Sequence, residues 1–348
     1  MSVRPSCARS WVPILDMSCD VAEARAGAMT ESTMQVRVKR ISYEAENINS
    51  YELVTATGGD LAPFAAGSHI DLHLPNGMIR SYSLVNDQRE LSRYVIAVNK
   101  DAVGRGGSRF IHDTIRAGDI IQISRPRNSF ALQEDASHSI LIAGGIGITP
   151  LLSMVRRLEA LGRKWKLFYA ARTRCAAAFL DELNALQPDI RSNLYIDLDD
   201  ERSGRLFDLG AIVGNAPVDA HLYCCGPVPM LEAFEAAAAD RPPHHVHVEY
   251  FKAKEKPAAE GGFEVTLARS NRTLKVQPGK TILDALLDAG IAVNYSCAEG
   301  VCGTCETLVL DGVPDHRDLF LSKEEHATNK SMMICCSGAK SPTLLLDI

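Results

Sequence analysis

Cys297-Ala-Glu-Gly-Val-Cys302-Gly-Thr-Cys305, near the C-terminal end of the chain, is the stretch that decides the fold. Its spacing is C-x4-C-x2-C, and a further cysteine, Cys335, follows downstream. This is the plant-type arrangement for a [2Fe–2S] cluster held by four thiolates. Two irons bridged by two sulfides need two cysteines each, so three ligands can come from one tight loop and the fourth from a distant segment. The pattern therefore predicts four metal ligands: Cys297, Cys302, Cys305 and Cys335.

The loop also contains two glycines, Gly300 and Gly303. We expect them where the backbone bends sharply and approaches the cluster closely, so that amide N–H groups can hydrogen-bond its sulfides. Two other readings of the four cysteines stay open at this point. They are a structural zinc site and unligated cysteines of a hydrophobic core.

Length and composition restrict the classes of protein to consider. A chain of 348 residues with 46% hydrophobic and 23% charged residues is typical of a globular protein of two or three domains. The net charge of −6 argues against general nucleic-acid binding, and no apolar run reaches the length of a membrane span. The other six of the ten cysteines show no framework spacing, which favours a reducing cytoplasm.

The chain divides by pattern into a tail and two units ahead of the cysteine loop. Residues 1–33 contain an apolar run too short for a signal peptide, and we expect either a disordered tail or an upstream start codon, because Met29-Thr-Glu begins a more conventional N-terminus. Residues 34–136 show short alternating runs separated by turn residues, which predicts a small antiparallel β-barrel. Residues 137–251 alternate buried-strand runs with helical segments, which predicts an α/β domain with a parallel sheet of nucleotide-binding type.

A linker and a third unit complete the chain. Residues 252–262 are charged and small, with no apolar content to bury, and they predict a flexible linker. Residues 263–348 contain a hairpin pattern, a helix over Thr281–Ala289, the cysteine loop and further strands, which predicts an α+β domain of β-grasp type. We expect the last strands around Cys335 and at Thr343–Asp347.

Two motifs in the predicted barrel carry groups that could bind a phosphorylated ring. Arg80-Ser81-Tyr82-Ser83 offers a cation for a phosphate, a hydroxyl for a ring edge and a flat aromatic side chain. Gly104-Arg105-Gly106-Gly107-Ser108 precedes a predicted helix, whose N-terminal N–H groups favour an anion. Each motif taken alone also suits a surface strand or a flexible loop.

Two further motifs lie at the ends of predicted parallel strands. Gly144-Gly145-Ile146-Gly147-Ile148-Thr149-Pro150 follows a strand and opens a helix, so it resembles the dinucleotide fingerprint G-x-G-x-x-G without matching it. Cys225-Gly226-Pro227 follows a later strand, at the edge of the sheet where ligands bind. Cys225 alone could equally be a small core residue.

The order of these motifs, ending in a plant-type ferredoxin loop, resembles the phthalate dioxygenase reductase family. Vanillate demethylase reductases look like the same family, which belongs to the ferredoxin–NADP reductase superfamily. The resemblance covers residues 34–348, nearly the whole chain. It implies an FMN-binding barrel, an NAD(H)-binding domain and a C-terminal [2Fe–2S] ferredoxin domain.

The resemblance also implies roles for individual residues. The flavin pocket would consist of Arg80, Ser81, Tyr82, Ala97, Val98 and Asn99, with Arg105, Gly106, Gly107 and Ser108 at the phosphate and Phe251 stacked near the flavin. The nicotinamide nucleotide would meet Gly144, Gly145, Gly147, Thr149, Gly226 and Pro227. Cys225 and Thr149 would lie closest to the transferred hydride. The family stretch Asp315-His316-Arg317-Asp318 has no evident chemistry, and we expect it to be structural.

The expected activity is electron transfer from NADH through FMN and the cluster to the terminal oxygenase of a Rieske non-haem iron system acting on an aromatic compound. FAD in place of FMN stays possible, and so does NADPH, because Arg172 and Arg174 follow the second strand of the nucleotide-binding unit. Alternative functions are a reductase for a haem or di-iron hydroxylase and a non-redox zinc-binding module. We expect a cytoplasmic monomer that meets its oxygenase transiently and binds neither membrane nor nucleic acid.

Overall fold

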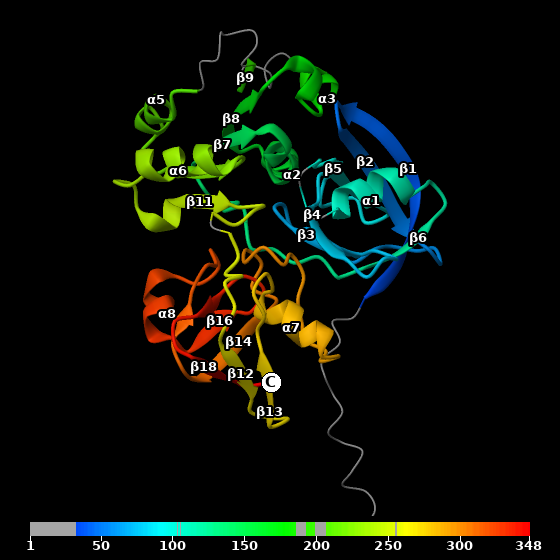
Figure 1. Cartoon of the computed structure of the whole chain (residues 1–348). Helices are drawn as coiled ribbons and strands as arrows, with labels where there is room; N and C mark the ends of the chain where they lie inside the picture. The colour runs from blue at the N-terminus through cyan, green and yellow to red at the C-terminus, as the bar shows by residue number, and fades with distance from the viewer. Residues whose placement is uncertain (1–32, 103, 105, 186–192, 199–206, 255) are drawn as a thin grey trace, which may run out of the picture.

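The computed structural model describes residues 33–102, 104, 106–185, 193–198, 207–254 and 256–348. Three sheets divide these residues into three units that follow one another along the chain (Figure 1). The predicted tail falls outside the described residues except for its last position. Among the helices that the structure describes, none is both long enough and apolar enough to cross a bilayer.

The first unit is an antiparallel barrel with the strand order β4-β3-β6-β1-β2-β5. Its strands are β1 (Met34–Ala45), β2 (Ile48–Thr55), β3 (His69–His73), β4 (Ile79–Ser83), β5 (Tyr94–Asn99) and β6 (Ile120–Ile123). A bridge between Leu84 and Ile96 joins the end of β4 to β5, so the sheet closes. Alternate residues such as Val36 and Val38 fill the interior, and Ile111 of α1 (Gly107–Thr114) is buried with them.

The second unit is a parallel sheet with the strand order β11-β10-β7-β8-β9. Its elements are β7 (His138–Gly144), α2 (Ile148–Ala160), β8 (Lys164–Ala171), α3 (Leu180–Asn184), β9 (Leu194–Leu198), α5 (Leu209–Gly214), β10 (His221–Cys225), α6 (Val228–Ala237) and β11 (Val246–Glu249). Helices cover both faces of this sheet, which explains why its strands read as continuous apolar runs.

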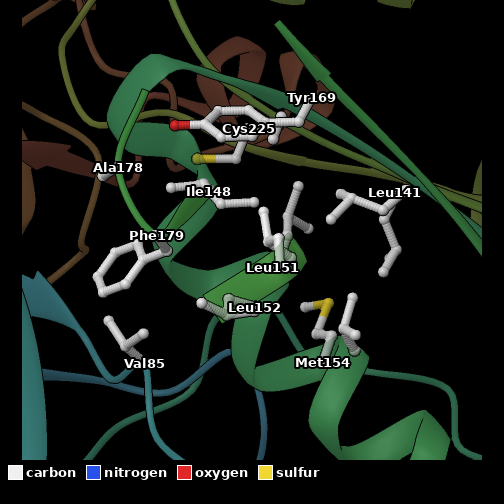
Figure 2. Packing of buried hydrophobic residues seen from close by; sticks show 14 of the residues in the cluster. Val85, Leu141, Ile148, Leu151, Leu152, Met154, Tyr169, Ala178, Phe179 and Cys225 are labelled. Atoms are coloured by element: carbon white, nitrogen blue, oxygen red, sulfur yellow. The ribbon is translucent and has the colours of Figure 1, made fainter. Parts of the chain in front are cut away.

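Side chains alternate along β7, so neighbouring residues pack on opposite faces of the parallel sheet. Leu141 packs in the cluster around α2, whereas Ile142 packs in the cluster around α5 and α6. Figure 2 shows the α2 side, where Val85 of the barrel joins Leu151 and Leu152. The barrel and the parallel sheet therefore share one apolar core, which holds their facing edges together.

The third unit is a mixed sheet with the strand order β13-β12-β18-β14-β16, and α7 packs on it. Its elements are β12 (Glu264–Leu267), β13 (Arg272–Lys275), α7 (Ile282–Asp288), β14 (Glu306–Asp311), β15 (Pro314–Asp315), α8 (Lys323–Thr328), β16 (Ser331–Met333), β17 (Gly338–Ala339) and β18 (Thr343–Leu346). A capping box between Thr281 and Asp284 starts α7. This is the predicted α+β arrangement of β-grasp type.

Several local predictions were wrong at the level of single elements. Cys335 does not lie in a strand but in the turn between β16 and β17. Helices α5 and α8 were not predicted, although Ser322 and Glu325 form a capping box at the start of α8. Helix α2 begins at Ile148 because a 3-10 turn over Gly145–Gly147 leads directly into it.

The predicted linker also differs from expectation, because part of it packs on the third unit. Ala258 is 4% exposed, and its N–H donates to the carbonyl of Cys336 at 2.8 Å. Gly279 donates to the carbonyl of Ala259 at 2.7 Å. The segment that follows Phe251 is therefore docked along the ferredoxin unit at this point and does not span a free gap.

A candidate redox site shared by three units

A cavity of about 470 Å³ lies where the three units meet, within the range of roughly 300–1,000 Å³ that suits small ligands. Arg80 and Tyr82 line it from the barrel, and Thr149 lines it from the parallel-sheet unit. Cys297 and Cys302 line it from the ferredoxin unit. Residues far apart in sequence thus share one space.

The barrel contributes the side of the cavity formed by β4 and β5. Ser81 and Tyr82 lie on β4, and Ala97 and Asn99 on β5; all four line the cavity. Val98, which the family resemblance places among the flavin contacts, points into the barrel core instead, because alternate residues of a strand face opposite sides. Its side chain therefore belongs to the fold and not to the cavity wall.

An anion-binding corner lies at the start of α1. Gly106 has a φ of 88°, and a side chain added at Gly107 would lie 2.4 Å from Nε of Arg80. The guanidinium thus rests against the first turn of a helix, where N–H groups have no partner within the helix and favour an anion. The hydroxyl of Ser108 accepts the N–H of Asp101 at 3.0 Å. Arg105 lies outside the described residues.

The glycine motif after β7 meets the end of β10. A side chain added at Gly147 would lie 2.1 Å from the carbonyl oxygen of Cys225, and one at Gly144 would collide with Pro227. Gly144, Gly147 and Gly226 let two parallel strand ends approach each other, whereas Gly145 has open space around it, and none of the four lines the cavity. Ile146 and Thr149 do line it. The Thr149 hydroxyl donates to the carbonyl of Ile146 at 2.9 Å.

Cys225 lies behind the cavity wall, fully buried, and its thiol faces a carboxyl group that the sequence analysis missed. The Sγ atom lies 3.9 Å from Oε2 of Glu249, which lines the cavity together with Ser83. Burial raises the pKa of Glu249 to about 8, and it also raises the pKa of Cys225. Both groups are mostly neutral at pH 7. A charged residue ending the apolar run before Phe251 was the signal available in the sequence.

Two of the four predicted ligands, Cys297 and Cys302, line the end of the cavity formed by the ferredoxin unit. The Cys297 thiol meets those of Cys302 and Cys335, and the N–H of Glu299 donates to Sγ of Cys297 at 3.3 Å. Cys305 and Cys335 are buried in the core of this unit. The neighbouring Cys297 thiol and burial raise the pKa of Cys302, so crowded thiolates here require cations between them. The donor set suits iron.

The two loop glycines are needed, though for a different contact from the one expected. Gly300 and Gly303 have φ values of 71° and 75°. A side chain added at Gly300 would lie 2.5 Å from Sγ of Cys336, and one at Gly303 would lie 2.3 Å from the ring of Phe320. The close approach is thus to neighbouring protein groups, which press the loop into its conformation.

A polar group of four residues, which we call the Asp71 cluster, connects the flavin-side strand to the cysteine loop. The Ser81 hydroxyl donates to Oδ1 of Asp71 at 2.7 Å and lies 3.0 Å from the hydroxyl of Ser296. Arg127 forms an ion pair with Asp71 and reaches Ser296 at 3.5 Å. Burial alone would raise the pKa of Asp71, but Ser296, Arg127 and Ser81 hold it below its ordinary value. Ser296 directly precedes Cys297.

Known proteins match the chain along most of its length. The family model for the 2Fe-2S iron-sulfur cluster binding domain matches residues 265–340, and that for the oxidoreductase NAD-binding domain matches residues 141–236. Phenoxybenzoate dioxygenase subunit beta of Ectopseudomonas oleovorans is 54% identical over 93% of this chain and 100% of its own length. Tetrachlorobenzoquinone reductase of Sphingobium chlorophenolicum is 50% identical over 91% of this chain and 98% of its own length.

A solved structure has the same fold as this chain. That of phthalate dioxygenase reductase, a modular structure for electron transfer from pyridine nucleotides to [2Fe–2S], superposes with a TM-score of 0.76 at 38% identity. The match covers 91% of this chain and 98% of that chain.

Fold and cavity together define a class: a modular oxidoreductase in which nucleotide-binding, barrel and ferredoxin units meet at one site. Within that class, the chain belongs to the phthalate dioxygenase reductase family. The predicted fold class and the NADH-dependent iron–sulfur oxidoreductase activity are confirmed. The predicted cofactors FMN, NADH and [2Fe–2S] are those of phthalate dioxygenase reductase. The cysteines therefore belong to an iron–sulfur domain and not to a zinc-binding module.

Proposed function

We propose that this reductase takes electrons from NADH and delivers them, through FMN and the [2Fe–2S] cluster, to a Rieske-type terminal oxygenase. The observation that carries the proposal is the single cavity lined by Tyr82, Thr149 and Cys302, one residue from each unit. A nucleotide, a flavin and a cluster held at this cavity would all lie within reach of one another. The relatives named for dioxygenase systems support an oxygenase as the partner.

The barrel side of the cavity fits FMN. Arg80 and the start of α1 with Gly106 and Gly107 would hold the phosphate, since cation and helix N–H groups converge there. Tyr82 and Phe251 would flank the ring system, because both are aromatic and line the cavity. When bound, such a flavin exchanges two electrons as a hydride with a nicotinamide and single electrons with an iron–sulfur cluster.

The nucleotide end fits a nicotinamide kept in neutral surroundings. Thr149 at the start of α2 would position the nucleotide, while Gly144 and Gly147 let strand ends and helix approach it closely. Cys225 would support the wall from behind, and Glu249 would face the ring as an uncharged acid at pH 7. Because these groups are uncharged, they would favour neither the oxidised nor the reduced nicotinamide during hydride transfer.

The cluster end fits electron exit. Cys297 and Cys302 line the cavity, whereas Cys305 and Cys335 lie on the core side of the ferredoxin unit. The Asp71 cluster would fix the loop against β4, so that the distance between the flavin and iron sites stays constant during turnover. We propose that the enzyme works as a cytoplasmic monomer and that its contact with the oxygenase is transient.

Reconstitution with a terminal Rieske oxygenase from the same genome tests the proposal. NADH-coupled formation of an oxygenated product is expected from the wild-type chain. The Cys302→Ser variant should support no product while NADH still bleaches its flavin, because the cluster is lost and the flavin is not. A Cys302→Ser variant that sustains normal product formation would refute the assigned route.

A second candidate acceptor deserves the same assay, because one relative with 50% identity is a tetrachlorobenzoquinone reductase. A halogenated benzoquinone can accept electrons without any protein partner. Quinone reduction by the wild-type chain at a rate far above that of oxygenase turnover would favour this second function. Retention of that rate in Cys302→Ser would place the electron donor at the flavin and not at the cluster.

A further inference from the structure

Three side chains converge on the ferredoxin unit outside the redox cavity: His316, Asp318 and His326. They come from the segment after β15 and from α8, and their ligand atoms all lie within 4.8 Å of one another. Nε2 of His326 lies 3.1 Å from Oδ1 of Asp318, and Nδ1 of His316 lies 3.8 Å from the same oxygen. In the part of the chain that the structure describes, no other group of three such residues comes this close.

The His316 ring is buried, and its two nitrogens form no hydrogen bonds with the described residues. Its side chain is 9% exposed, and neither Nδ1 nor Nε2 has a hydrogen-bond partner among the described residues. Asn329 approaches the ring without reaching hydrogen-bond geometry. Burial and the neighbouring His326 lower the pKa of His316, so the ring is neutral at pH 7. A buried imidazole needs hydrogen-bond or ligand partners for its nitrogens, and the described residues supply none at hydrogen-bond distance.

Asp318 is held in place by other contacts. Its side chain is fully buried, and Oδ2 accepts the N–H of Leu321 at 2.9 Å. Oδ1 therefore faces the two imidazoles with little freedom to turn away. The two imidazole rings are stacked with their centroids 4.3 Å apart, and a small rotation of the partly exposed His326 ring would turn its nitrogen toward an ion at Asp318. His326 is 26% exposed, so an ion could enter from solvent and keep water ligands.

We propose that His316, Asp318 and His326 form a binding site for one divalent transition-metal ion of the zinc class. Two neutral imidazoles and one carboxylate are a donor set that Zn²⁺ takes in proteins, with water completing the coordination. The site is separate from the four cysteines and requires none of them. It also gives a chemical role to the stretch Asp315-His316-Arg317-Asp318, which the sequence analysis had left as structural.

The position of the site connects it to the redox chemistry. Leu319, next to Asp318, donates its N–H to the carbonyl of Gly300 at 2.9 Å, inside the cysteine loop. A cation bound at Asp318 would therefore place positive charge close to the iron–sulfur cluster. Positive charge favours the reduced, more negative state of a cluster, so occupancy should shift its reduction potential upward.

Metal analysis of the intact holoprotein tests the proposal, with Zn²⁺ as the probe. Protein with its full iron content is equilibrated with Zn²⁺, and bound zinc and iron are measured together, with affinity taken from titration calorimetry. His326→Gln changes a partly exposed helix residue and should fold normally. It should weaken zinc binding at least about tenfold, because even outer-shell partners of metal ligands matter that much. His316→Gln should act in the same way.

The matched control is His244→Gln. His244 lies in a separate histidine-rich patch on the parallel-sheet unit, with His245 beside it, and could bind zinc on its own. His244→Gln should leave the high-affinity zinc, and the zinc-induced rise in cluster potential, as in the wild type. If the wild-type chain takes up no more zinc than His326→Gln while iron is retained, the three side chains hold only water and the proposal is wrong.

Discussion

The two ends of the redox cavity are built on opposite electrostatic principles. The end at Cys225 and Glu249 contains acidic groups that burial keeps protonated. At the other end Ser81 and Cys297 line the cavity, and behind them lies an ionised carboxylate, Asp71, held by Arg127 and by the hydroxyls of Ser81 and Ser296. The groups at the first end are neutral, whereas those behind the wall of the second end are charged.

The difference fits the roles proposed for the two ends. Hydride transfer moves a negatively charged unit, so fixed charges next to it would favour one side of the reaction. Holding a separate domain against the barrel needs directional contacts, and a buried ion pair with hydrogen bonds provides them. The comparison teaches that the groups proposed to face the nicotinamide are neutral, whereas the contact between the barrel and the ferredoxin unit is charged.

Cys302→Ser should have the largest effect, since it removes one ligand of the iron–sulfur cluster. A serine hydroxyl is a poor iron ligand, so cluster assembly should fail and reduction of an iron–sulfur-dependent partner should fall to background. NADH should still reduce the flavin at nearly the wild-type rate. Iron content and stopped-flow bleaching of the flavin measure the two ends separately. Loss of both activities would show that the ends do not work independently.

Asp71→Asn should come next, because it neutralises the charged joint while keeping its shape. Arg127 is then left without its anion, and we expect a loss of about 1–3 kcal/mol in the free energy of unfolding. Electron transfer from flavin to cluster should slow about tenfold, since misplacement by about 1 Å can cost more than that. Rapid-mixing spectroscopy of cluster reduction measures the rate of this electron transfer, and denaturant unfolding measures the loss of stability.

The control for this joint is Ser296→Ala, which keeps the ion pair and removes one hydroxyl. It should slow cluster reduction less than Asp71→Asn does, and flavin reduction by NADH should stay unchanged in both variants. Equal slowing of flavin reduction and cluster reduction in Asp71→Asn would mean that Asp71 supports the barrel in general and does not act as a joint.

Gly303→Ala should have a smaller effect, confined to the cysteine loop. The added methyl group would collide with Phe320, and φ of 75° disfavours alanine. We expect a loss of about 1–3 kcal/mol in stability of the ferredoxin unit, as for other overpacked sites. Thermal loss of the cluster absorbance should therefore occur at lower temperature. A matched Gly290→Ala variant, also at positive φ but with open space around it, separates collision from backbone strain.

Glu249→Gln should have the smallest effect on electron transfer at pH 7, where the native carboxyl is still mostly protonated, and a clear effect on how stability changes with pH. Burial raises the folded-state pKa to about 8, from an ordinary value of 4.5. Between these values the folded chain holds a proton that the unfolded chain has lost, so stability falls as pH rises to about 8 and then levels off. The variant should lack this slope in denaturant unfolding and should lack the matching change in flavin reduction rate. If the variant keeps the same pH dependence of stability, that dependence belongs to another titratable group.

Much of the site could be predicted from the sequence because its chemistry depends on local spacing. The C-x4-C-x2-C loop, the glycine-rich turn before α1 and the strand-to-helix turn at Gly144–Gly147 are each short, so neighbours in sequence are neighbours in space. Val98 shows the limit of this logic. It lies between two residues that line the cavity, but its side chain points into the barrel core because side chains alternate along a strand. Glu249 was missed because its only local signal, a charge at the end of an apolar run, does not by itself show that the carboxyl group is buried.

Contacts between distant segments that no motif marks could not be predicted. Ser81 and Ser296 meet only because the ferredoxin unit folds back against β4, and the linker around Ala258 docks because that unit offers it the carbonyl of Cys336. His316 and His326 come together through the placement of α8, an element that the sequence did not reveal. By itself, then, the sequence determined which cofactors the chain uses, because each cofactor is recognised by a short motif. Only the tertiary structure decided which groups are neutral, which are charged and which units share a wall, because burial and pairing are properties of the packed chain.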